Sequence, residues 1–153
     1  MRQIRINENK LHKIIKENID NVITQQIVDK LLSLGAVETT NNKRTADDLS
    51  PQTIKMIENN EEIYKWVIGF NNRDFCSKQD FKSMYNAESA CNKILKEINF
   101  KEIYKKDRRA YAQVEVYFVE TFDYDFGNIP AGYTSIESDT CLVYSPKDDM
   151  WMD

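Results

Sequence analysis

The hydrophobic pattern of the chain changes its period near Arg109. Before this point, apolar residues recur every three or four positions, which is the period of an amphipathic α-helix. In YAQVEVYFVETFDYDF, residues 111–126, they occupy most even positions: Ala112, Val114, Val116, Phe118, Phe122, Tyr124 and Phe126. This period of two predicts a long strand with a bulge at Glu120, and TCLVYS, residues 140–145, predicts a strand that pairs back. We therefore expect an α+β fold, with three or so N-terminal helices followed by a long antiparallel strand pair or a small sheet.

The first helix is predicted by apolar residues that form one stripe between positions 11 and 32. These residues are Leu11, Ile14, Ile15, Ile19, Val22, Ile23, Ile27, Val28, Leu31 and Leu32. Gly35 follows the last apolar residue, where a glycine with positive φ commonly ends a helix. The first sixteen positions hold one acid, Glu8, against five basic residues, Arg2, Arg5, Lys10, Lys13 and Lys16. We expect residues 1–35 to form a basic amphipathic helix.

A polar linker and one α+β domain are predicted after this helix. Residues 36–48 are mostly polar and show no period, so they are expected to form a loop or linker. Residues 49–153 are expected to form the α+β domain. Within it, Ser50 followed by Pro51 is a strong helix start signal, and the apolar pattern extends this helix to Gly69.

A third helix is predicted to start at Ser77. Asp80 stands three positions later, as in a capping box, and the apolar face of the helix extends to Ile98. The last eight residues, PKDDMWMD, are polar around Trp151. We expect them to form an exposed tail whose tryptophan is available for packing.

The types and spacing of the reactive residues argue against several kinds of site. His12 is the only histidine, and Cys76, Cys91 and Cys141 are widely spaced. A structural zinc site needs four Cys or His ligands in closely spaced pairs, so we expect no metal and three cysteines in or near the core. The chain has no glycine-rich phosphate loop and no apolar run of about 20 residues that could span a membrane. We expect a cytoplasmic protein without cofactor, membrane partner or enzymatic activity.

Charge is distributed unevenly along this chain, whose net charge is −4. Residues 101–111, KEIYKKDRRAY, are basic, but residues 110–153 hold nine acids against Lys147 alone. Such a surface repels a polyanion, so nucleic acid is expected to make at most a local contact. An acidic surface can also mimic nucleic acid. The alternative function is therefore an inhibitor of a DNA- or RNA-binding host enzyme that acts through Asp123, Asp125, Glu137 and Asp139.

The basic N-terminal helix needs a surface to pack on. A helix with a narrow apolar stripe is marginally stable alone in water, so it gains most of its stability by burying that stripe. The stripe can pack on the protein's own core or in the groove of a partner protein, and the sequence leaves both open. In the second case, the binding residues are the apolar anchors Leu11, Ile14, Ile15, Ile19 and Val22 and the flanking charges Lys10, Lys13 and Lys16.

The opening stretch IRINENKLHKIIKENIDNVI resembles a leader at the start of many small proteins of tailed phages and of mobile elements of gut anaerobes. The shared pattern is a basic pair around Ile4 and Ile6, an Asn-Glu cap and the apolar anchors that follow, and it covers about the first 23 residues. The resemblance implies a virion-associated protein, structural or packaged cargo, that docks on a protein partner within a larger assembly. It implies a place in the host cytoplasm or in the virion, and it brings no catalytic residues.

Overall fold

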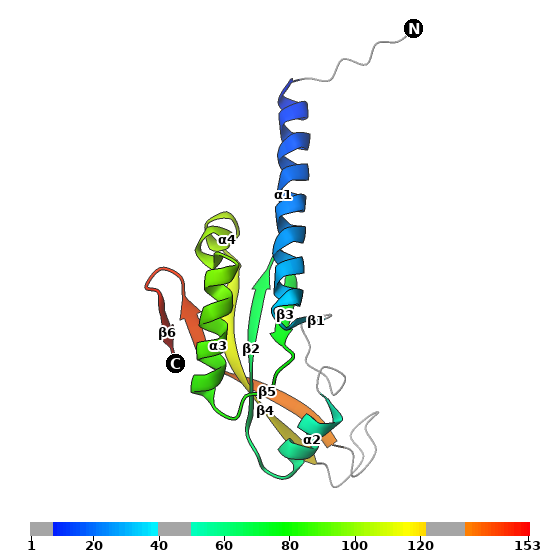
Figure 1. Cartoon of the computed structure of the whole chain (residues 1–153), viewed down its shortest axis with the longest axis vertical. Helices are drawn as coiled ribbons and strands as arrows, with labels where there is room; N and C mark the ends of the chain where they lie inside the picture. Colours follow the sequence, from blue (N-terminus) through cyan, green and yellow to red (C-terminus); the bar gives the residue numbers. More distant parts are fainter. Residues whose placement is uncertain (1–7, 40–49, 122–133) are drawn as a thin grey trace.

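The computed structural model describes residues 8–39, 50–121 and 134–153, and the side chains of residues 21–39, 50–118 and 137–153. In this part of the chain there are four helices and six strands (Figure 1). The helices are α1 (Glu8–Ser33), α2 (Pro51–Glu58), α3 (Met84–Glu97) and α4 (Phe100–Lys106). The strands are β1 (Ala36–Thr39), β2 (Ile63–Phe70), β3 (Arg73–Ser77), β4 (Tyr111–Thr121), β5 (Thr134–Ser145) and β6 (Met150–Met152).

The six strands form one antiparallel sheet in the order β1-β3-β2-β4-β5-β6. The α+β class is confirmed, but the expected order of helices first and strands last is wrong, because three strands precede α3. The second helix ends at Glu58 and does not continue to Gly69. Residues 63–70 form β2, in which nearly every side chain is buried. A strand that is buried on both faces loses its period of two, so its apolar run cannot be told from a buried helix by pattern alone.

Three helices cover one face of the sheet, which we call the helical face. Its core side chains from the strands include Trp66, Ile68, Phe70, Phe75, Ala112, Val114 and Leu142. They pack against residues of α1, α3 and α4, which include Val28, Leu31, Cys91, Leu95 and Phe100. The predicted place of the cysteines is confirmed, because Cys76 and Cys91 are buried and Cys141 is partly buried. The eight-residue helix α2 packs against the opposite face, where Ile57 meets Ile63 and Tyr117.

Two predicted helix boundaries are confirmed, and the predicted start of the third helix is wrong. Gly35 ends α1 with a φ of +93°, and the Ser50 hydroxyl caps α2 by accepting from the backbone N–H of Thr53 at 3.1 Å. Ser77, however, is the last residue of β3, because this segment pairs with both β1 and β2. The third helix begins only at Met84, where Ser83 is the N-cap.

Other differences follow from strand pairing. The segment predicted as a linker starts with β1, which pairs with β3, while residues 40–49 lie outside the described residues. The register shifts between Val114 and Glu115, where Cys141 is the extra residue on β5. Glu120 pairs regularly with Ser135, so the predicted position of the bulge is wrong. The C-terminal residues form β6 and no free tail, and Trp151 Nε1 donates to Asn92 Oδ1 of α3 at 2.7 Å.

Candidate functional site

The two ends of α1 have different surroundings. At the C-terminal end, Val28 and Leu31 are buried in the core of the helical face. The N-terminal half projects beyond the sheet and beyond the other helices, as Figure 1 shows. Among the described side chains of this 26-residue helix, those that belong to the core come from its C-terminal end.

The exposed and buried apolar positions of α1 also lie on different sides of the helix. Each residue of an α-helix turns by about 100°, so the nine steps from Val22 to Leu31 place these two residues about 180° apart. Val22 is 58% exposed, whereas Leu31 is 0% exposed. Leu32 is exposed as well, so the prediction of one continuous apolar stripe is wrong.

The sequence places further apolar residues on the side of Val22. By the same rotation, Leu11, Ile15 and Ile19 lie within about 60° of Val22, and Ile14 lies between the two sides. We call Leu11, Ile15, Ile19 and Val22 the outer face of α1. The predicted anchors at positions 11, 14, 15 and 19 and the flanking Lys10, Lys13 and Lys16 belong to α1, but their side chains lie outside the described residues.

The acidic residues of the alternative function are placed only in part. Glu137 and Asp139 are exposed on β5, two positions apart. Asp123 and Asp125 lie outside the described residues. The described pair therefore forms one short acidic surface at the edge of the sheet.

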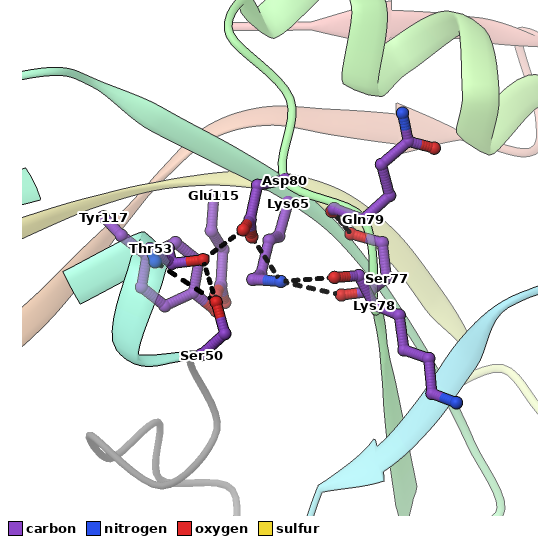
Figure 2. A network of polar contacts seen from close by, with 9 residues as sticks. All are labelled: Ser50, Thr53, Lys65, Ser77, Lys78, Gln79, Asp80, Glu115 and Tyr117. Atoms are coloured by element: carbon purple, nitrogen blue, oxygen red, sulfur yellow. Dashed lines mark hydrogen bonds and ion pairs between the residues drawn. The ribbon is translucent and has the colours of Figure 1, made fainter. Parts of the chain in front are cut away.

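A buried polar network lies on the face of the sheet opposite the helical face, and Figure 2 shows it from close by. Its centre is Lys65 of β2, which is 3% exposed. The Lys65 ammonium lies 2.7 Å from Asp80 Oδ1 and donates to the backbone oxygens of Ser77 at 3.0 Å and Lys78 at 3.3 Å. The ammonium therefore combines one ion pair with two hydrogen bonds to backbone oxygens. The network therefore holds the segment between β3 and α3 against the sheet.

The same network reaches α2 on one side and β4 on the other. The Thr53 hydroxyl donates to Asp80 and lies 2.7 Å from the Ser50 hydroxyl at the start of α2. On β4, Glu115 accepts from the Tyr117 hydroxyl at 2.9 Å and from Gln113 Nε2 at 2.8 Å. Lys65 and Glu115 are directly opposite in the register of β2 and β4. We call Lys65, Asp80, Glu115 and their hydrogen-bonding partners the polar network.

Our reading of the sequence missed the polar network. The sequence predicts a capping-box position for Asp80 and a helix over the segment that contains Lys65, and neither prediction points to this network. The signal that could have found the network is the lysine within the otherwise apolar run IYKWVIGF. A charge in a buried strand needs a partner, so this lysine predicts an acid that packs against β2.

A cleft of about 830 Å³ lies beside the C-terminal half of α1. Its apolar lining comes from α1, the end of β2 and the α3–α4 region: Ile23, Ile27, Phe70, Ile98 and Ile103. The turn between β2 and β3 and the residues after α4 add asparagines and charges to its rim. Ile27 is five residues from Val22, which puts the cleft and the outer face on different sides of α1.

The ionisable groups with shifted pKa values are explained by local packing. Burial raises the pKa of the Cys91 thiol, which is therefore protonated at neutral pH. Burial and the hydrogen bond to Asp149 raise the pKa of Tyr144 to about 12. The hydrogen bond to Glu62 raises the pKa of Tyr64 to about 12. These are the shifts expected of groups that stabilise the fold in their protonated form.

Comparison with known proteins does not assign the chain to a family. No family model matches it, and neither the curated proteins nor the solved structures give a match. Among the described residues, no helix is long and apolar enough to cross a membrane. The same residues contain no group of three or more His, Cys, Asp or Glu side chains that could hold a metal ion.

Proposed function

We propose that this protein acts without catalysis and docks on a partner protein through the outer face of α1. The observation that carries the proposal is the exposure of Val22 on the side of the helix opposite the buried Leu31. The apolar positions of α1 can pack either on the protein's own core or on a partner. Val28 and Leu31 pack on the core. The outer face is then available to a partner.

Helix stability supports the same proposal. The N-terminal half of α1 projects beyond the sheet and the other helices, and most helices in proteins gain their stability from tertiary packing (Figure 1). Apolar residues at positions 11, 15, 19 and 22 have the spacing with which a helix fills a hydrophobic groove. The basic residues Lys10, Lys13 and Lys16 would speed association with an acidic partner surface.

The finer proposal is a virion-associated protein of a tailed phage, either structural or packaged as cargo. Its support is the resemblance of residues 4–23 to the leaders of small phage and mobile-element proteins. A helix that projects from a compact domain is suited to hold that domain on a larger assembly. The domain itself would then face away from the docking site.

The test is affinity capture from native-host and phage-infected lysates, with the full chain and two variants as bait. The docking variant is Ile15→Asp/Ile19→Asp, and the control is Asn9→Asp/Asn21→Asp, which adds two acids on other sides of the same helix. Circular dichroism and a thermal melt establish that all three fold. A truncation at Gly35 is unsuitable, because it removes Val28 and Leu31 from the core.

The captured proteins decide between the proposals. Docking through α1 is supported if the full chain and the control enrich the same partner and the docking variant loses it. Enrichment of capsid, portal or tail proteins supports the virion-associated role. If the docking variant folds and retains the partner, the outer face is not the binding surface.

The acidic inhibitor remains as the second candidate because Glu137 and Asp139 are both exposed on β5. This function does not need the outer face of α1. Capture of a nuclease, polymerase or repair enzyme by the full chain and the docking variant alike would support it. Loss of that enzyme with a Glu137→Lys/Asp139→Lys variant would assign the contact to the acidic surface.

A further inference from the structure

The strand β5 is much longer than the strand that pairs with its outer edge. It spans twelve residues, Thr134–Ser145, and its inner edge pairs with β4. On the outer edge, β6 pairs only with residues 143–145 (Figure 1). In the described part of the chain, no strand pairs with the outer edge of residues 134–142, which we call the β5 edge.

An unpaired strand edge offers a row of backbone N–H and C=O groups. Such an edge can accept an extended peptide as an additional strand, with main-chain hydrogen bonds as the common source of affinity. The presence of β6 at one end shows that the sheet continues in this direction. The remaining nine positions are long enough for a typical strand of about 5–6 residues.

The charges of the β5 edge determine which kind of peptide can bind to it. Glu137 and Asp139 are exposed and, being two residues apart, lie on the same face of the sheet. Residues 137–153 contain five acids and one base, Lys147. Opposite charges on neighbouring strands stabilise their pairing, and like charges directly opposite each other destabilise it.

A second copy of the chain is a poor occupant of this edge. Two β5 edges paired antiparallel about Ser138 would place Glu137 of each copy opposite Asp139 of the other. This arrangement brings four carboxylates together on one face of the sheet. Charged side chains on an edge strand commonly protect a protein from such self-pairing.

We propose that the β5 edge binds an extended, lysine- or arginine-rich segment of another protein as a seventh strand. The backbone of residues 134–142 supplies the hydrogen bonds, and Glu137 and Asp139 select basic side chains at alternate positions of the added strand. This proposal goes beyond docking through α1. It uses a different surface, so either of the two can fail without the other.

The test uses the full chain and a nine-residue synthetic peptide of alternating lysine and valine. Fluorescence anisotropy measures its affinity, and hydrogen exchange locates the bound peptide. A second peptide has the same sequence with every second backbone amide methylated, which removes the donors that a paired strand needs. We expect slower exchange in residues 134–142 with the first peptide only.

Two charge-reversal variants distinguish binding at the β5 edge from attraction of the peptide by the net charge of the protein. Glu137→Lys/Asp139→Lys changes the edge, and Asp29→Lys/Glu97→Lys makes the same change of net charge on exposed positions of α1 and α3. We expect the first variant to weaken binding about tenfold or more and the second to change it far less. A neutral variant, Glu137→Gln/Asp139→Asn, keeps the test valid if the charge reversal prevents folding, and it should weaken binding about threefold.

Four results would overturn the proposal. The first is the absence of binding, and the second is protection that maps outside residues 134–142. The third is equal weakening by the edge variant and by the control variant, which would mean that the peptide follows net charge alone. Dimerisation of the chain through the β5 edge would assign the edge to a second copy and would also refute a basic peptide as its occupant.

Discussion

The two faces of the six-stranded sheet are stabilised in different ways. The helical face is apolar, and Trp66, Ile68 and Val114 pack there against three helices. The opposite face holds buried charges, among them Lys65 and Glu115. The same strands supply both faces, since successive side chains of a strand alternate between them.

Because of this difference, we expect positions on the helical face to tolerate substitution better than the buried charges of the opposite face. Apolar burial has no direction, so a core accepts many changes that conserve volume. A buried charge needs a particular partner at a particular distance, as Lys65 does with Asp80 at 2.7 Å. We therefore expect the helical face to contribute most of the stability and the polar network to position α2 and the segment before α3.

The largest single effect is expected from a change that leaves a charge in the polar network without its partner. Lys65→Met should lower the free energy of unfolding by about 3–5 kcal/mol, because Asp80 would lose its counter-ion in a partly buried site. On the helical face, Ile68→Val should cost about 0.5–1.5 kcal/mol. Urea unfolding of the two variants measures the contrast.

A double variant tests the reason for this effect. Lys65→Met/Asp80→Leu removes both charges and should recover a large part of the loss, because well-packed apolar residues often replace a buried ion pair without net cost. If Lys65→Met alone costs less than about 1 kcal/mol, the proposed contrast between the faces is wrong.

The second prediction defines where the helical face ends along α1. Leu31→Ala should cost about 2–5 kcal/mol, since it leaves a cavity at a fully buried position. Val22→Ala should change the free energy of unfolding by no more than about 0.5 kcal/mol. Urea unfolding measures both, and similar costs at the two positions would mean that the outer face packs on the protein's own core.

The comparison of the faces also explains how much of the fold could be predicted from the sequence. The N-terminal part of β4 alternates the half-buried Tyr111 and Gln113 with the buried Ala112 and Val114, and its period of two predicted a strand correctly. In β2 both faces are buried, by helices on one side and by the polar network on the other. Its alternation was lost, and the segment was assigned to a helix.

Some parts of the candidate site could be predicted from the sequence and others could not. The hydrophobic period of the sequence predicted α1 and its apolar residues. It could not show that Val22 is exposed and Leu31 is buried, because that depends on where the domain packs against the helix. The polar network joins Lys65 to Asp80 and Thr53 across sequence distances that no local pattern contains. Local signals such as Ser50 and Gly35 were predicted correctly because caps depend on neighbouring residues alone.

The third prediction concerns Tyr144, which is buried at the C-terminal side of the helical face. Burial and the hydrogen bond to Asp149 at 2.5 Å raise its pKa to about 12, so the folded state favours the protonated phenol. The stability that this group contributes is complete below pH 10 and is lost as the pH rises through about 12. The loss is on the order of 2 kcal/mol.

The measurement is chemical unfolding of the wild type and of Tyr144→Phe between pH 8 and 12. The decline of stability with pH should be shallower in the variant, and it should not vanish, because the pKa of Tyr64 is also raised. Parallel curves for the two proteins would mean that Tyr144 ionises as easily in the folded state as in the unfolded one.

The smallest effect is expected at the outer strand pair, where charges are paired but not buried. Glu38 of β1 and Arg73 of β3 are 2.5 Å apart and about one third exposed, so water screens much of their attraction. The hydrogen bond from Arg73 lowers the pKa of Glu38 below its usual value of 4.5. The contribution is therefore present above that pH and is lost as the pH falls through the lowered pKa.

Glu38→Gln should cost about 0–1 kcal/mol at pH 7, and the gap to the wild type should close in acid, where Glu38 is protonated as well. Urea unfolding of both proteins at pH 7 and in acid measures the gap. The comparison with Lys65 tests the role of burial. Lys65 and Arg73 each have a carboxylate oxygen within 2.7 Å, and the two ion pairs differ mainly in burial. If Glu38→Gln lowered the free energy of unfolding as much as Lys65→Met, the distance between the paired charges, rather than their burial, would determine how strongly each charge depends on its partner.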